Sequence, residues 1–220
     1  MRRDPIITRS FAIAWGAHFS FATAVCVLLH FPGFLRDLGA SEVEIGTIAA
    51  AMSGAAIAVR PLVGPWIDRR GRGECLRVGL GAHALVTLAY FAFDTVGPWV
   101  FVVRALHGIA QAAATSVLFT LATDTIPASR RTEAIALFGI SGMLPLGVGT
   151  LLGEGLLGVG GYGLLFGVST ALSAVAALLG FLVHDLPTTQ PVGRPRGVFG
   201  ILESRALFPI WAAGFGFTLA

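Results

Sequence analysis

The segment that decides the fold reads Gly64-Pro65-Trp66-Ile67-Asp68-Arg69-Arg70-Gly71-Arg72 and joins two long apolar runs. Gly64 and Pro65 both disfavour a continuing helix, so we expect the first run to end there. Asp68 then lies at the mouth of the helix, and Gly71 permits a sharp reversal. A short turn with these charges predicts that the chain reverses at a membrane face, with the arginines in the cytoplasm.

The composition supports a membrane protein. Hydrophobic residues make up 55% of the chain and charged residues only 12%, whereas a soluble domain carries about twice that charged fraction. Each apolar run approaches the roughly 20 residues that a spanning helix needs, and none alternates as the strands of a membrane barrel would. We therefore predict an all-α bundle of six transmembrane helices over residues 11–31, 45–67, 76–93, 98–123, 134–152 and 162–183.

The arginines set the predicted orientation. All 15 basic residues are arginine, and Arg36 alone falls in a loop on the outer side of this arrangement. Arg60 and Arg104 lie inside apolar runs. The net charge of +3 is thus a topology signal and does not indicate nucleic-acid binding. The remaining twelve share the cytoplasmic side: Arg2, Arg3, Arg9, Arg69, Arg70, Arg72, Arg77, Arg130, Arg131, Arg194, Arg196 and Arg205.

These charges predict a multi-pass protein of the cytoplasmic membrane with its N-terminus inside the cell. The long connection after the sixth run is basic and contains three prolines, which is typical of a linker between domains. We therefore divide the chain into a six-helix unit over residues 1–184, a cytoplasmic linker over 185–205, and the start of a seventh helix over 206–220.

Three further motifs have informative patterns. Arg104-Ala105-Leu106-His107-Gly108 approaches R-x-x-Q-G, with histidine in the glutamine position. The segment from Asp124 to Arg131 fits D-x-x-P-x-x-x-R. The segment from Gly142 to Gly149 approaches G-P-x-x-G-G, although Leu144 precedes the proline and the glycines are respaced.

Together with the G-x-x-x-D-R-x-G-R turn, these motifs resemble those of the major facilitator superfamily of transporters. The resemblance implies the N-terminal half of a twelve-helix protein, built from 3+3 inverted repeats, that moves a small solute by alternating access. The segment after Gly142 is similar to a motif of proton-driven exporters, so proton-coupled efflux is the preferred direction. The alternatives are an uptake permease or uniporter of the same fold, or a six-helix membrane subunit that transports nothing.

The expected partners are the lipid bilayer, a small-molecule substrate, protons, and either a C-terminal six-helix half or a second copy of the chain. We expect no cofactor, no metal and no nucleic acid. The sequence contains no G-x-S-x-G, no H-E-x-x-H and no pair of carboxylates inside an apolar run, so we do not predict an enzyme.

The candidate substrate and proton pathway lies on the run 98–123. Arg104, His107 and Gln111 follow at i, i+3 and i+7 and therefore share one helix face. A charged side chain in lipid is costly, so this face should line a cavity; the alternative is an arginine bonded to the backbone. His18 lies at mid-depth on the first run and could also carry protons, because imidazole titrates near neutrality.

Other histidines and the remaining motif residues have different expected roles. We interpret His83, with Thr87 and Tyr90, as structural. The resemblance implies that Asp68 latches one conformation against the second half and that Arg72 pairs with Asp124; the alternative for Asp68 is a solvated carboxylate. The gating motif then comprises Gly64, Asp68, Arg69, Gly71, Arg72 and Asp124.

Small residues mark two predicted packing faces. Gly54 and Ala58 are spaced four apart, as are Gly149 and Gly153. Such pairs allow close approach of helices, and Pro145 adds a bend because it removes a backbone donor. These faces could slide against the second half during transport or pack statically within the six-helix unit.

Overall fold

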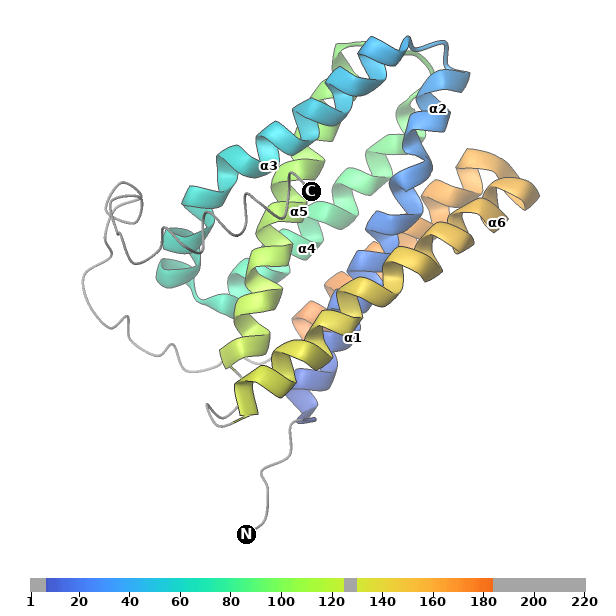
Figure 1. Ribbon diagram of the computed structural model, residues 1–220. Coiled ribbons are helices and arrows are strands. Elements are labelled where there is room, and N and C mark those ends of the chain that lie inside the picture. The colour runs from blue at the N-terminus through green and yellow to red at the C-terminus, as the bar shows by residue number, and fades with distance from the viewer. Residues whose placement is uncertain (1–6, 125–129, 184–220) are drawn as a thin grey trace. The chain divides into compact units, whose positions relative to one another are not determined.

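The computed structural model describes residues 7–124 and 130–183, and every regular element in these ranges is a helix. Figure 1 shows the helices gathered into one bundle. The predicted linker at 185–205 and the predicted seventh helix at 206–220 lie outside the described residues.

Five helical spans of the described chain are long and apolar enough to cross a membrane. The first combines α1, a short 3-10 segment η1 and α2, and the third combines α4 and η2. The elements are α1 (Arg9–Val27), η1 (Leu28–His30), α2 (Phe31–Asp37), α3 (Glu42–Arg70), α4 (Arg72–Leu88), η2 (Ala89–Ala92), α5 (Pro98–Asp124) and α6 (Arg131–Phe181).

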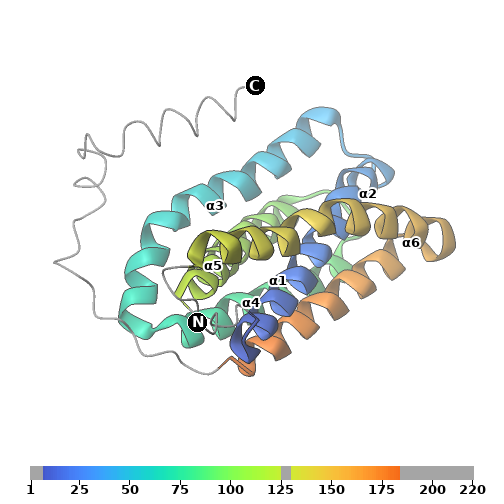
Figure 2. The same cartoon turned by 60° about the horizontal axis from the view of Figure 1, so that its bottom comes forward.

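The last element contains two of the six predicted runs. The runs expected at 134–152 and 162–183 both belong to α6, which has 51 residues. A straight helix of that length would measure about 76 Å, far beyond the roughly 30 Å core of a bilayer. Gly161 interrupts it with φ 63° and ψ −162°, a conformation that glycine adopts without a steric penalty. Figures 1 and 2 show that α6 folds back on itself and forms two legs.

The end of α3 corrects one prediction, that the helix ends at Gly64 and Pro65. The helix continues through Pro61 and Pro65 to Arg70, and the reversal occurs at Gly71, whose φ is 83°. The two prolines are four residues apart, so their missing hydrogen bonds fall on one side of the helix and bend it instead of ending it. The curvature of α3 is visible in Figure 2.

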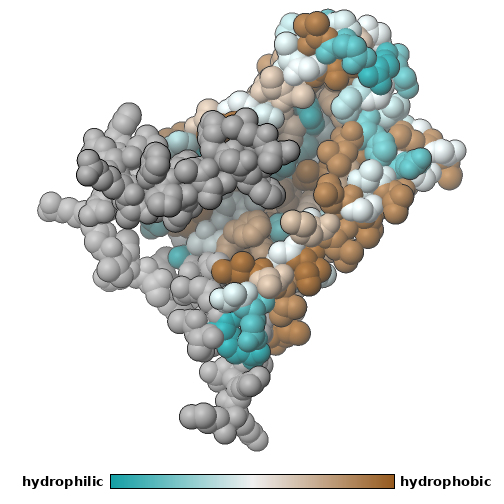
Figure 3. Space-filling model, in the orientation of Figure 1, coloured by the Kyte–Doolittle hydropathy of each residue, from teal (hydrophilic) through white to brown (hydrophobic). Residues whose placement is uncertain are grey.

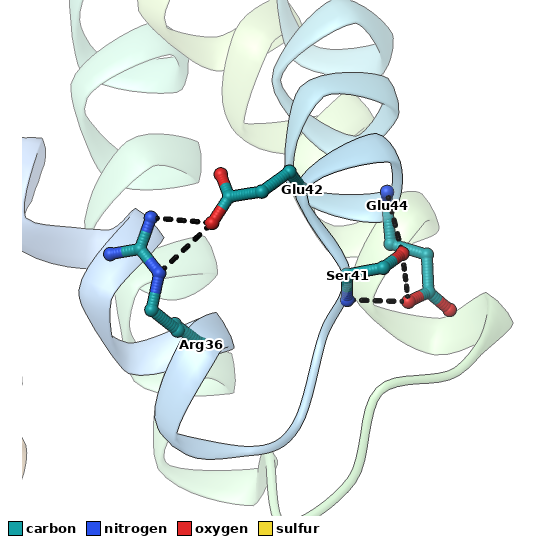
Figure 4. Close-up of polar contacts among 4 residues, drawn as sticks. All are labelled: Arg36, Ser41, Glu42 and Glu44. Carbon is teal, nitrogen blue, oxygen red and sulfur yellow. Dashed lines mark hydrogen bonds and ion pairs between the residues drawn. The ribbon is translucent and has the colours of Figure 1, made fainter.

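Polar side chains define the turn between α2 and α3 (Figure 4). The Ser41 hydroxyl accepts from the Glu44 backbone N–H, while the Glu44 carboxylate accepts from the Ser41 N–H at 2.8 Å, forming a capping box. Arg36, the predicted outer-side arginine, donates to the Glu42 carboxylate at 2.8 Å. These contacts fix the entry angle of α3.

The surface agrees with a membrane environment. Large apolar side chains point outward along the helices, as in Met143 at 77% exposed and Leu151 at 72%. Figure 3 shows apolar surface along the bundle and hydrophilic residues gathered toward its ends. The described chain is therefore an all-α, multi-pass membrane protein.

Helix α1 packs closely on α6, which explains one of the two small-residue faces. A methyl group at Gly149 would lie 2.6 Å from the Cβ of Cys26, and one at Gly153 would lie 2.5 Å from Cδ2 of His30. Pro145 is also buried on α6. By contrast, a methyl group at Gly54 would meet nothing within 4 Å, and both Gly54 and Ala58 are exposed. The α6 pair thus packs within the described bundle, and the α3 pair does not.

The close contact at Gly149 predicts a measurable loss of stability. In the full-length protein, Gly149→Ala should lower the free energy of unfolding by about 1–3 kcal/mol, because the added methyl group overpacks the contact with α1. Gly147→Ala on the same helix is the matched control, since a methyl group there would meet nothing within 4 Å. Thermal unfolding in detergent measures both variants, and equal melting temperatures would contradict the packing described.

Candidate functional site

Arg104 is held in place by two aromatic residues. Its Nη1 donates a hydrogen bond to the Tyr90 hydroxyl at 3.0 Å, and its guanidinium carbon lies 4.7 Å from the centre of the Phe31 ring. Arg104 comes from α5, Tyr90 from η2, and Phe31 from the start of α2. The predicted alternative, an arginine bonded to the backbone, is thus replaced by a hydroxyl and a cation–π contact.

Tyr90, which was expected to be structural, is the centre of the cluster. Its hydroxyl also bonds to Nδ1 of His107, and its side chain is 1% exposed. A hydroxyl both donates and accepts, so Tyr90 can join the arginine to the histidine. The available signal was the spacing of seven residues from His83, which placed both side chains on one face of a single helix.

His83 and His107 lie against each other inside the bundle. Their ring centres are 4.7 Å apart and the planes are nearly perpendicular. Their side chains are 0% and 1% exposed. Both ring nitrogens of His83 and Nε2 of His107 lack a hydrogen-bond partner among the described residues. The structure therefore places His83 in the same polar cluster as His107.

The three residues predicted to share an open face differ in accessibility. Arg104 and Gln111 are half-buried, whereas His107 is enclosed by Tyr90 and His83. The carbonyl oxygen of Gln111 has no hydrogen-bond partner in the described part of the chain. The structure thus leaves Arg104 and Gln111 as the partly accessible members of this face.

His18 belongs to a second site, between α1 and α6. Its Nδ1 lies 2.7 Å from the Ser141 hydroxyl, and its ring stacks on Phe138 at 4.7 Å. The Ser141 hydroxyl donates its hydrogen to the Phe138 carbonyl, so its oxygen is left to accept a hydrogen bond from Nδ1–H of His18. This tautomer leaves Nε2 as an acceptor. No hydrogen bond within the described residues joins His18 to His107.

The gating-motif residues other than Asp124 lie where α3 ends and α4 begins. Gly64, Asp68 and Arg69 are exposed, and Gly71 forms the turn itself. The ion pair described here joins Arg70 to Glu74 at 2.9 Å. The Asp124 side chain lies outside the described residues, so the pairing of Asp124 with Arg72 stays a prediction.

An apolar pocket of 320 Å³ opens between α3, α4 and α5. Val59, Trp66, Val86 and Ile109 are among its lining residues, and none of the predicted pathway residues lines it. On α5 the pocket therefore lies away from the face of Arg104. Its lining is almost entirely apolar and suits hydrocarbon.

The fold and these sites define a helical membrane protein with polar residues buried inside its bundle. The family model of the Major Facilitator Superfamily matches residues 11–220, and the chain belongs to this family of transporters.

A curated relative adds a second similarity. The chain is 29% identical, over 121 residues, to the staphylopine export protein of Staphylococcus aureus. The match covers 55% of this chain and 30% of the relative's length. The chain therefore aligns with less than a third of that protein.

The Tyr90 cluster predicts the effect of removing one oxygen atom. Tyr90→Phe in the full-length protein should lower the free energy of unfolding by about 1–3 kcal/mol, because it leaves the partners on Arg104 and His107 buried and unbonded. Tyr162→Phe is the control, since the Tyr162 hydroxyl makes no hydrogen bond among the described contacts. Thermal unfolding of the two variants should differ, and a Tyr90→Phe protein as stable as the wild type would show that the hydroxyl holds nothing together.

Proposed function

We propose that this chain is the N-terminal half of a secondary active transporter that exports a small solute in exchange for protons. The observation that carries this proposal is membership of the Major Facilitator Superfamily over residues 11–220. Export is favoured because the named relative is an export protein.

The unequal packing of the helices supports alternating access. In the spanning window of α3 only 11% of residues are buried, compared with 56% in that of α1. The exposed small residues Gly54 and Ala58 lie on this poorly covered helix. A face with little cover and small side chains suits a contact with a second half that changes during transport.

Two buried histidine sites support proton coupling. His18 presents an acceptor nitrogen beside Ser141, and His107 lies within hydrogen-bond reach of Tyr90. The spanning parts of the described helices offer no carboxylate pair for this task. Imidazole is the side chain best suited to gain and lose a proton near neutral pH, so the histidines are the proposed proton carriers.

Everted membrane vesicles test the proposed direction and coupling. Vesicles from cells that produce the full-length protein are acidified inside, and a fluorescent dye follows the pH gradient. An exporter that exchanges solute for protons should dissipate the gradient when its substrate is added outside, because protons leave as solute enters. Staphylopine is one test compound, within a panel of small anions, cations and neutral solutes.

The same assay tests the latch role of Asp68. Asp68→Asn should abolish or sharply slow dissipation at normal protein levels, whereas Asp37→Asn, an exposed acid at the other membrane face, should behave as wild type. Equal dissipation rates in the two variants would show that Asp68 has no latch role and that the motif only forms a turn. Dissipation confined to right-side-out vesicles would indicate uptake, solute movement insensitive to the gradient would indicate a uniporter, and no movement at all would indicate a non-transporting subunit.

The proposed orientation has its own test. Cys26 and Cys75 are both buried, so they contribute little background to thiol labelling. A membrane-impermeant maleimide applied to intact cells should label cysteine at Asp37 and should miss cysteine at Arg69 and at Arg194. Labelling at Arg69 but not at Asp37 would reverse the topology, because both side chains are exposed at opposite ends of the bundle.

A further inference from the structure

We propose that Arg104 binds a carboxylate group of the transported solute, which places the substrate among organic anions. This inference rests on the proposed transport function and adds the substrate class and its anchoring residue.

The first step concerns charge. An arginine within a membrane helix is costly, up to about 2.5–3.5 kcal/mol at the helix centre on insertion scales. Arg104 follows six residues after the start of α5, within a membrane-spanning segment. None of the ion pairs described involves Arg104, and its contacts within the described chain are to uncharged groups. An anion at this position would supply the missing charge.

The second step concerns geometry. Nη1 of Arg104 already donates a hydrogen bond to the Tyr90 hydroxyl, and the Phe31 ring lies against the guanidinium group. The Nε–Nη2 edge remains for a ligand, and Nε is a buried donor without a partner in the described part of the chain. Two parallel N–H groups match the two oxygens of a carboxylate. The arginine is thus already oriented for bidentate binding.

The third step concerns access and selectivity. Arg104 is half-buried, and Gln111, on the same helix face, is half-buried too. The carbonyl oxygen of Gln111 is itself buried and has no partner in the described part of the chain, and a donor group elsewhere on a bound solute would satisfy it. The neighbouring cluster residues Tyr90 and His107 carry no negative charge, so neither competes with a solute carboxylate for Arg104. The low dielectric of the site strengthens a charge-assisted bond above its value in water.

A binding experiment on the purified full-length protein tests this site without requiring transport. The probe is benzoate, and benzamide of the same shape but without charge is the ligand control. Benzoate should raise the melting temperature in a concentration-dependent manner by mass action, and benzamide should not. Arg104→Gln should weaken benzoate binding by about ten- to a hundredfold, the effect of losing a charge-assisted hydrogen bond.

Two further variants separate a binding role from a folding role. Arg104→Lys keeps the charge without the planar fork, so it should bind benzoate with intermediate affinity. Arg60→Gln removes an exposed arginine of α3 and should bind benzoate as the wild type does. Equal binding by the wild type and Arg104→Gln would overturn the inference. If the wild type binds no benzoate, the inference is also overturned. An acidic residue of the proposed second half would then be the expected partner of Arg104.

The inference and the transport proposal can fail separately. Proton-coupled solute movement in the vesicles together with Arg104-independent benzoate binding would overturn the carboxylate site and leave the transporter intact. Benzoate binding that requires Arg104, in a protein that moves no solute, would overturn the transport proposal and leave the site.

Discussion

The constraint on which the structure depends is that a bilayer offers no water to the backbone. Every N–H and C=O within the hydrocarbon must find its partner inside the chain, and a helix provides this within one segment. All described spans are helices for this reason, including the bent α3 and the folded α6. The same constraint applies to side chains, so most polar groups inside the bundle contact one another, and a few, such as Nε of Arg104 and the carbonyl oxygen of Gln111, stay buried without a partner in the described part of the chain.

The cluster around Tyr90 shows how this constraint gathers residues that are distant in sequence. One hydroxyl, buried beside Phe31, serves both Arg104 and His107. His83 completes the group through its ring contact with His107. The cluster compensates part of the cost of an intramembrane arginine and orients the remaining edge of its guanidinium. Stability and recognition would thus depend on the same contacts.

Helices α1 and α6 pack tightly against each other, whereas α3 is poorly covered by the rest of the described bundle. Trp15 and His18 on α1 bond to the first leg of α6, and Ser169 on its second leg donates to the Ala24 carbonyl at 3.0 Å. These contacts, with the close approach at Gly149, tie α1 to both legs. α3 makes its closest approach at Gly108 of α5 and leaves its small-residue face open. The described bundle thus combines a firmly packed core with an open helix face.

Local patterns determined the features that single segments control. Apolar runs predicted the helices, Gly71 marked the reversal, and helical spacing put Arg104, His107 and Gln111 on one face. The orientation that the arginines indicate stays a prediction. Other features depended on contacts between segments that no local pattern records. Hydrogen bonds of Trp15, His18 and Ser169, for example, tie α1 to both legs of α6, on either side of Gly161.

The partners of the polar residues were also decided by the tertiary structure. Tyr90, His83 and Ser141 became parts of buried polar clusters because packing brought them to Arg104, His107 and His18. The sequence by itself determined which residues had to leave lipid, since that depends on each side chain's own polarity. Only the packed bundle decided which groups they met, because hydrogen bonds and ring contacts depend on positions set by distant helices.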